Sequence, residues 1–161
     1  MPYRMHAEYL RRLFLNNDLA EGRFIVTGKP IALSDIRAPI FTVGTVSDHV
    51  APWRSTYKIN LLTDTDVTYL LTSGGHNAGI VSQPGRDGRS FQIKTKKVDG
   101  HYVDPETYLA EAPRKEGSWW PEWSAWLAGQ SGEATAPPPI GAAAAGYAPR
   151  CDAPGTYVLQ E

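Results

Sequence analysis

The sequence of 161 residues contains a single cysteine, Cys151, and no uninterrupted apolar run near the ~18 residues that a membrane-spanning helix requires. One cysteine excludes an internal disulfide and any metal site built from paired cysteines. Neither sign of charge is in excess, because 16 Lys and Arg residues balance 17 Asp and Glu residues. Neither nucleic acid nor a membrane is therefore indicated as a partner.

The first residues, MPYRMHAEYLRR, lack the apolar segment of a secretion signal, and we therefore expect a cytoplasmic location. Hydrophobic residues make up 42% of the chain and aromatic residues 11%, which is enough for one packed domain. The end of the chain differs in composition, because 17 of the 25 residues in 131–155 are Ala, Pro or Gly. We expect residues 131–161 to form an extended tail.

Two local patterns occur near the N-terminus. Residues 3–15 carry apolar side chains at spacings of three and four, which predicts an amphipathic helix. Residues 24–27 and 31–33 are short strand candidates on either side of the Gly28-Lys29-Pro30 turn, and together they predict a hairpin.

The next pattern is typical of a parallel sheet. Residues 39–44 and 67–72 are apolar runs that each end in a polar loop, and they predict two buried strands. Between them, aromatic and aliphatic residues recur every four positions, which predicts a helix over residues 53–62. A strand, a helix and a strand in this order form a βαβ unit, whose strands run parallel. The predicted fold class is therefore α/β.

The remaining elements are shorter. Residues 90–95 are a candidate edge strand. Asp104 and Pro105 supply an N-cap and a first-turn proline, and they predict a helix that runs to Ala112. Ser118 is expected to cap one more helix. Its tryptophan cluster favours core packing over a ligand platform and comprises Trp119, Trp120, Trp123 and Trp126.

Asp48 and His76 are the residues with the clearest chemical potential. Each lies in the loop that directly follows one of the two buried strands. Parallel neighbouring strands place such loops at the same edge of the sheet, so a carboxylate and an imidazole can meet there. A carboxylate bonded to one ring nitrogen fixes the tautomer and leaves the other nitrogen as a general base. The Gly74-Gly75 step before His76 allows a sharp turn of the backbone.

A purely structural interpretation of these residues stays open. In it, Asp48 caps the helix over residues 53–62 and His76 is an ordinary loop histidine. His49, beside Asp48, is interpreted as a residue at the rim of the site or in contact with the catalytic pair rather than as a catalytic group. The spacing of Asp48, His49 and His76 matches no compact zinc signature, and no metal site is predicted.

An Asp–His pair of this kind needs a nucleophile, and no G-x-S-x-G or G-x-C-x-G turn occurs in these 161 residues. Cys151 lies in the Ala, Pro and Gly-rich segment, after both partners in chain order and outside any strand–turn–helix context. We interpret it as an incidental residue rather than the nucleophile.

The motifs around these residues resemble the C-terminal part of class I polyhydroxyalkanoate synthases. The D-H-x-x-P-W motif starts at Asp48 and the S-G-G-H-x-A-G motif contains His76, 28 residues later. The resemblance extends over almost the whole chain. Its other segments are Tyr9-Leu10-Arg11, Val43-Gly44-Thr45, Gly117-Ser118-Trp119-Trp120-Pro121-Glu122-Trp123 and Ala153-Pro154-Gly155-Thr156-Tyr157-Val158.

The resemblance implies the C-terminal portion of an α/β-hydrolase fold and an acyltransferase that polymerises (R)-3-hydroxyacyl-CoA into polyester with release of CoA. Asp48 and His76 then occupy the positions of the catalytic aspartate and histidine. Asp48 either supports His76 or helps to deprotonate the incoming 3-hydroxyl group. The thiol that carries the growing chain lies in an upstream part of such enzymes. No cofactor is implied, and the expected location is the surface of a polyester granule.

Residues 1–22 then correspond to the end of a cap over the site, residues 23–130 to the C-terminal part of the catalytic domain and residues 131–161 to the tail. Three interpretations of the chain stay open. It is a synthase fragment that is inactive alone, a subunit completed by a separate polypeptide that carries the nucleophile, or a non-catalytic module bound to granules or to a full-length synthase.

Overall fold

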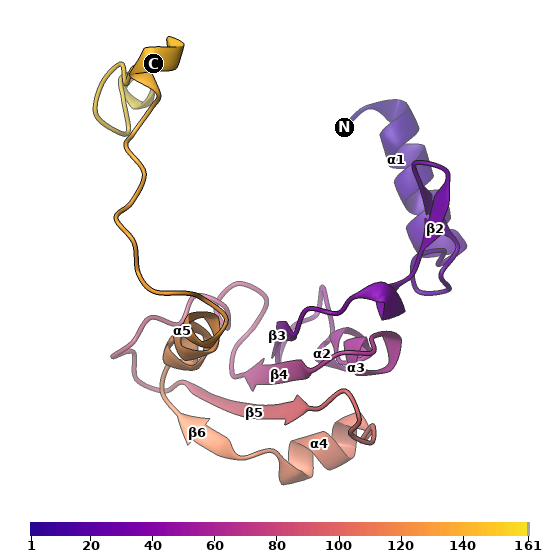
Figure 1. The fold of residues 1–161 in the computed structure, drawn as a ribbon. Coiled ribbons are helices and arrows are strands. Elements are labelled where there is room, and N and C mark those ends of the chain that lie inside the picture. Colours follow the sequence, from indigo (N-terminus) through magenta and orange to yellow (C-terminus); the bar gives the residue numbers. More distant parts are fainter. Residues whose placement is uncertain (161) are drawn as a thin grey trace. The chain divides into compact units, whose positions relative to one another are not determined.

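The computed structural model of the chain describes residues 1–160. They divide after Gly129 into two compact units, which are described separately. The first unit contains a four-stranded mixed sheet with the strand order β3-β4-β5-β6 (Figure 1). The bounds of the strands are Ile40–Thr45 for β3, Val67–Thr72 for β4, Ser90–Lys96 for β5 and Arg114–Glu116 for β6.

The pairing of β3 with β4 confirms the predicted parallel strands. β3 and β4 run parallel in a register that places Ile40 beside Val67 and Thr45 beside Thr72. β4 is buried along its whole length, as its uninterrupted apolar and β-branched sequence predicts. β5 and β6 each pair antiparallel with their neighbours, which makes the sheet mixed.

Alternate residues of β4 enter two separate cores because side chains alternate between the two faces of a strand. On one face, Tyr69 lies in an aromatic cluster with ring centroids 4.8 Å from Tyr57 and 5.5 Å from Tyr108. On the other face, Leu70 packs with Phe91 and Trp119. The helices beside the aromatic cluster are α2 (Trp53–Thr56), α3 (Ile59–Leu62) and α4 (Pro105–Glu111).

The single helix predicted over residues 53–62 is wrong in one respect, because the structure contains two short helices, α2 and α3. Polar side chains compete for the backbone carbonyls in this segment. The Thr56 hydroxyl donates to the carbonyl of Trp53 at 3.0 Å, and the Asn60 amide donates to the carbonyl of Tyr57 at 2.9 Å. These bonds accompany the break between the two helices.

The strand predicted over residues 90–95 is present as β5, but it is not an edge strand over its whole length. β5 lies inside the described sheet because β6 pairs with its first half, Ser90 opposite Glu116 and Gln92 opposite Arg114. The sequence RKE of β6 is short and charged, so it carries no hydrophobic alternation that would predict a strand.

The N-terminal predictions are confirmed with a shifted turn. Residues 3–15 are helical, as α1 (Tyr3–Tyr9) followed by the π-helical segment η1 (Leu10–Leu15). The hairpin forms between β1 (Phe24–Val26) and β2 (Lys29–Ile31), and a 3-10 turn, η2 (Leu33–Asp35), follows it. Thr27 and Gly28 both have positive φ, 48° and 80°, which is typical of a two-residue hairpin turn, so Lys29 and Pro30 belong to the strand.

The two predicted C-terminal helices of the first unit are present. The Asp104 carboxylate accepts hydrogen bonds from the Glu106 and Thr107 amides at the start of α4. The Ser118 hydroxyl accepts from the Trp120 amide, 3.1 Å away, where α5 (Trp120–Gly129) begins. The prediction of core packing holds for Trp119, which is 5% exposed, and fails for Trp123, which is 43% exposed.

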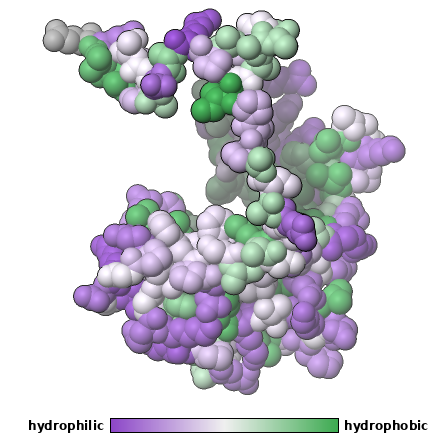
Figure 2. All heavy atoms as spheres, turned by 60° about the vertical axis from the view of Figure 1, so that its left-hand side comes forward, coloured by the Kyte–Doolittle hydropathy of each residue, from purple (hydrophilic) through white to green (hydrophobic). Residues whose placement is uncertain are grey.

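The second unit begins at Gln130, and the expected extended tail over residues 131–161 stays a prediction. Its described part is exposed at nearly every residue and contains only the short 3-10 turns η3 (Ala143–Ala145) and η4 (Tyr157–Leu159) and one bridge between Ala142 and Tyr147. On the face of the molecule in Figure 2, hydrophobic residues of the sheet-containing part are scattered among hydrophilic ones. The division into residues 1–22, 23–130 and 131–161 that the sequence leads us to expect stays a prediction.

The outer side of β3 has no partner strand among the described residues, so we predict that the 161-residue chain self-associates when it is purified alone. The amides of Ile40 and Val46 donate to the carbonyls of Asp66 and Thr72, and the period of two then turns the amide of Val43 outward. Val43→Pro removes this outward donor and should lower the association, as measured by light scattering across a concentration series. A monodisperse wild-type monomer with one cooperative thermal transition would contradict the prediction.

Candidate active site

The loops that carry Asp48 and His76 leave the sheet side by side. The parallel pairing of β3 with β4 continues beyond both strands, because the Val46 amide donates to the carbonyl of Thr72 and the Ser47 amide to that of Gly74, each at 3.0 Å. The segment after β3 is thereby fixed against the segment after β4.

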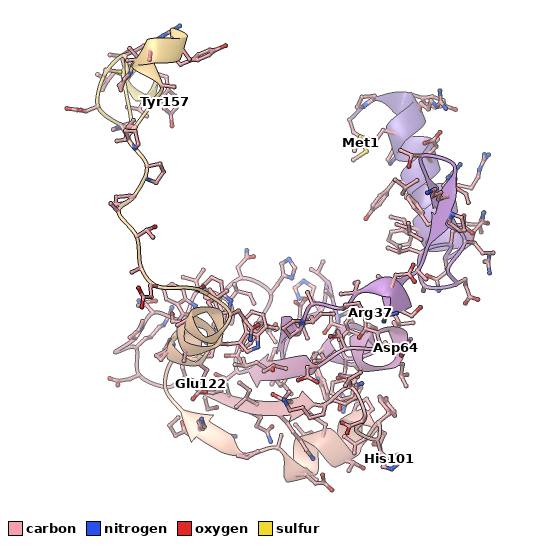
Figure 3. The ribbon with its side chains drawn as sticks, in the orientation of Figure 1. Met1, Arg37, Asp64, His101, Glu122 and Tyr157 are labelled. Carbon is pink, nitrogen blue, oxygen red and sulfur yellow. The ribbon has the colours of Figure 1, made fainter. Side chains whose placement is uncertain are left out.

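The two side chains meet at this edge. The Nδ1 atom of His76 lies 2.9 Å from Oδ2 of Asp48 and 3.1 Å from Oδ1. This confirms the prediction that the pair lies within hydrogen-bond distance at the C-terminal ends of two parallel neighbours. His101, in contrast, follows β5, whose C-terminal end lies beside the start of β4 at the opposite end of the strands (Figure 3).

Asp48 is held as a carboxylate. Its Oδ1 atom accepts hydrogen bonds from the amides of Val50 at 2.8 Å and Ala51 at 2.9 Å, and its side chain is only 8% exposed. The Ala51 amide, followed by the hydrogen bond from His76, lowers the pKa of Asp48 to about 2. These bonds lie within the loop, and no side chain caps α2, so the interpretation of Asp48 as a helix cap is wrong.

His76 presents the other half of its ring to solvent. Its side chain is 47% exposed, and Nδ1 is the ring atom that contacts Asp48. Over residues 1–160, Nε2 makes no hydrogen bond, which leaves it available to a group that is brought to this edge. His49 is exposed, and its contact role stays a prediction.

Glycine is required at two positions of the His76 loop. Gly74 has φ of +108°, and a Cβ atom there would lie 2.8 Å from Nη1 of Arg89. A Cβ atom on Gly79 would lie 2.6 Å from Cγ2 of Thr45, so β3 and this loop pack too closely for a larger residue. The sharp turn expected of the Gly74-Gly75 step rests on Gly74, because a Cβ atom on Gly75 would be at an ordinary 3.7 Å from the carbonyl of Ser47.

Two tryptophans attach the end of the His76 loop to the rest of the fold, a role that the sequence analysis did not identify. The indole of Trp119 donates to the carbonyl of Gly79 at 3.0 Å, and the indole of Trp120 donates to that of Ile80 at 2.9 Å. The Ser118 hydroxyl donates to the carbonyl of Ser82. The signal in the sequence is that a buried indole N–H needs an acceptor, and loop carbonyls supply it.

The sequence analysis also did not identify the role of the Tyr69 hydroxyl. This hydroxyl donates to the carbonyl of Trp53 at 2.9 Å and lies 2.7 Å from the Thr56 hydroxyl. It therefore fastens the segment that follows the Asp48 loop to β4, which leads to His76. Gly44 leaves room for this hydroxyl, since a Cβ atom at Gly44 would overlap it.

Cys151 is exposed and lies in the second unit. The first unit contains no cysteine, because Cys151 is the only one in the sequence. The fold and the site together define an α/β protein with a carboxylate-supported imidazole at the C-terminal edge of a parallel strand pair. No described helix has the length and apolar character needed to cross a membrane.

Comparisons with known proteins identify the relatives of this chain, although no protein-family model matches it. It is 36% identical over 156 residues to the poly(3-hydroxyalkanoate) polymerase subunit PhaC of Rhizobium etli, which covers 96% of this chain and 23% of that protein. It is 35% identical over 159 residues to the polymerase subunit PhaC of Cupriavidus necator, with 98% and 26% covered. Poly(3-hydroxyalkanoate) polymerase 2 of Ectopseudomonas oleovorans is 35% identical over 160 residues, with 99% and 28% covered.

These matches show that the chain belongs to the polyhydroxyalkanoate synthase family, and they are consistent with the C-terminal part of such an enzyme. The relatives are named as polymerases of hydroxyalkanoates, and such polymerases are acyltransferases. The chain spans about a quarter of the length of the curated relatives that it matches.

The lowered pKa of Asp48 predicts a pH-dependent stability. A carboxyl group whose pKa is lower in the folded state stabilises the fold above its unfolded pKa, near 4, and this contribution disappears as the pH falls towards 2. Asp48→Asn removes it. We would measure urea unfolding in the Val43→Pro background. The difference in the free energy of unfolding between the proteins with and without Asp48→Asn should shrink as the pH falls from about 4 to 2. A difference that does not vary with pH would contradict the assignment.

Proposed function

We propose that this chain is the part of a polyhydroxyalkanoate synthase that supplies the aspartate and histidine of a Cys-His-Asp triad, with a fold of the α/β-hydrolase type. The observation that carries the proposal is the contact of 2.9 Å between His76 Nδ1 and Asp48 Oδ2, which leaves Nε2 free at a solvent-exposed edge. The similarity to named polymerases supports the same assignment.

In this proposal, Nε2 of His76 removes the proton of a thiol that is carried by a segment outside these 161 residues. The thiolate attacks the carbonyl of an (R)-3-hydroxyacyl-CoA, a new thioester forms and CoA leaves with the proton. Asp48 keeps the imidazole in the tautomer with the proton on Nδ1 and stabilises the imidazolium. Its low pKa keeps it ionised during this step.

The second half of the cycle transfers the acyl chain to the 3-hydroxyl group of the next monomer. The oxygen of that hydroxyl attacks the thioester, its proton passes to the base and the sulfur becomes the leaving group. Either His76 or Asp48 serves as this base. His76 is the more exposed of the two, since the Asp48 side chain is only 8% exposed.

A chimera tests the proposal directly. We would replace the segment of the Cupriavidus necator polymerase subunit that matches this chain, 26% of its length, with residues 1–161 and measure CoA release from 3-hydroxybutyryl-CoA. The chimera should turn over, and His76→Ala should lower kcat by about 10³-fold or more, because it removes the general base. The purified 161-residue chain should release no CoA.

His101→Ala and Cys151→Ser are the matched controls, because His101 lies at the other end of the strands and Cys151 lies in the tail. Both variants of the chimera should keep their turnover. A folded chimera without turnover would favour a non-catalytic granule-associated or synthase-associated module. Loss of turnover in Cys151→Ser alone would make Cys151 the nucleophile and overturn the proposal.

A further inference from the structure

Arg89 lies beside the His76 loop because β5 is antiparallel to β4. The first residue of β5, Ser90, therefore sits next to the end of β4, and the Ser73 amide donates to the Ser90 carbonyl at 2.8 Å. Arg89 directly precedes β5, and its guanidinium lies against Gly74, where a Cβ atom would come within 2.8 Å of Nη1. Gly74 is two residues from His76.

This guanidinium belongs to a partly buried residue and has no anionic partner. Within the described chain, its side chain makes no hydrogen bond or ion pair, although its own carbonyl accepts from the Gly117 amide. The neighbouring Asp87 is exposed and forms no ion pair in residues 1–160. The carboxylate of Asp48 already contacts His76 and accepts hydrogen bonds from two backbone amides. A partly buried guanidinium with no protein anion beside it is available to bind an anion from elsewhere.

We propose that Arg89 binds a phosphate group of the CoA portion of the substrate. This inference rests on the proposed function, in which the acyl group arrives as a CoA thioester. A guanidinium offers a planar pair of N–H donors that matches a phosphate, and it remains charged at every physiological pH. The flexible pantetheine arm separates the reacting thioester from the phosphates, so the acyl group can reach His76 while a phosphate occupies Arg89.

Two substrates separate this role from a structural one. 3-Hydroxybutyryl-CoA carries the phosphates, whereas the N-acetylcysteamine thioester of 3-hydroxybutyrate keeps only the cysteamine end of the pantetheine arm and has none. In the chimera, Arg89→Ala should raise KM for the CoA thioester by about 10–100-fold, as expected for the loss of one charge-assisted contact, and leave kcat/KM for the short thioester unchanged. Arg89→Lys should have an intermediate effect because it keeps the charge without the planar donor pair.

Arg86→Ala is the matched control, because Arg86 is exposed on the same segment and its Nη1 lies 3.5 Å from the carbonyl of Val81. It should leave both KM values unchanged. An equal loss for both substrates in Arg89→Ala would instead show that Arg89 pairs with a carboxylate of the protein, and it would overturn the proposal.

Binding measurements separate a failure of the Arg89 proposal from a failure of the proposed catalytic function. If the chimera folds but lacks turnover, calorimetric titration with CoA and with phosphate-free pantetheine still tests Arg89. The proposal predicts that Arg89→Ala weakens the binding of CoA and not that of pantetheine. Equal binding of CoA by wild-type and Arg89→Ala proteins would refute it regardless of activity.

Discussion

The in-register parallel pairing of β3 with β4 is the constraint on which the site depends. Thr45 lies beside Thr72, and the ladder continues through Val46 and Ser47 into the loops. A shift of one residue would turn Tyr69 and Leu70 to the opposite faces and would separate the two loops. The contact between Asp48 and His76 is therefore a consequence of how two buried strands align, and the loop sequences complete it.

Three other contacts hold this edge in place from different directions. Tyr69 reaches across to Trp53, just after the Asp48 loop, and the indoles of Trp119 and Trp120 hold the end of the His76 loop. They position the side chain of His76, which is itself exposed. A rigid frame with an exposed imidazole is the arrangement expected where a reacting group comes from another segment, since the imidazole is oriented before that group arrives.

The sequence predicted the elements whose signals are local and periodic. The helix at residues 3–15, the buried parallel strands and the capped helix after Asp104 were all found, and so was the pairing of Asp48 with His76. The break between α2 and α3 was missed because it involves side-chain hydrogen bonds to the backbone from Thr56 and Asn60, which the hydrophobic period does not encode.

Other features depend on contacts between residues far apart in sequence. β6 is three charged residues that form a strand only because Ser90–Gln92 offers a free edge. The hairpin turn was displaced because Thr27 adopts a positive φ that its residue type does not favour. The roles of Tyr69 and Trp119 required knowing which carbonyls lie within reach of a buried hydroxyl and a buried indole, and no pattern within one segment gives that information.

In the proposed mechanism, His76 activates a thiol that another segment supplies. Its most direct measurement is the pH dependence of iodoacetamide alkylation of that thiol in the chimera, with the modified cysteine identified by mass spectrometry. The thiol should react rapidly near neutral pH, and His76→Ala should shift the rate profile to higher pH, because the imidazole no longer favours the thiolate. The same rate profile in the wild-type and His76→Ala proteins would show that His76 does not activate the thiol.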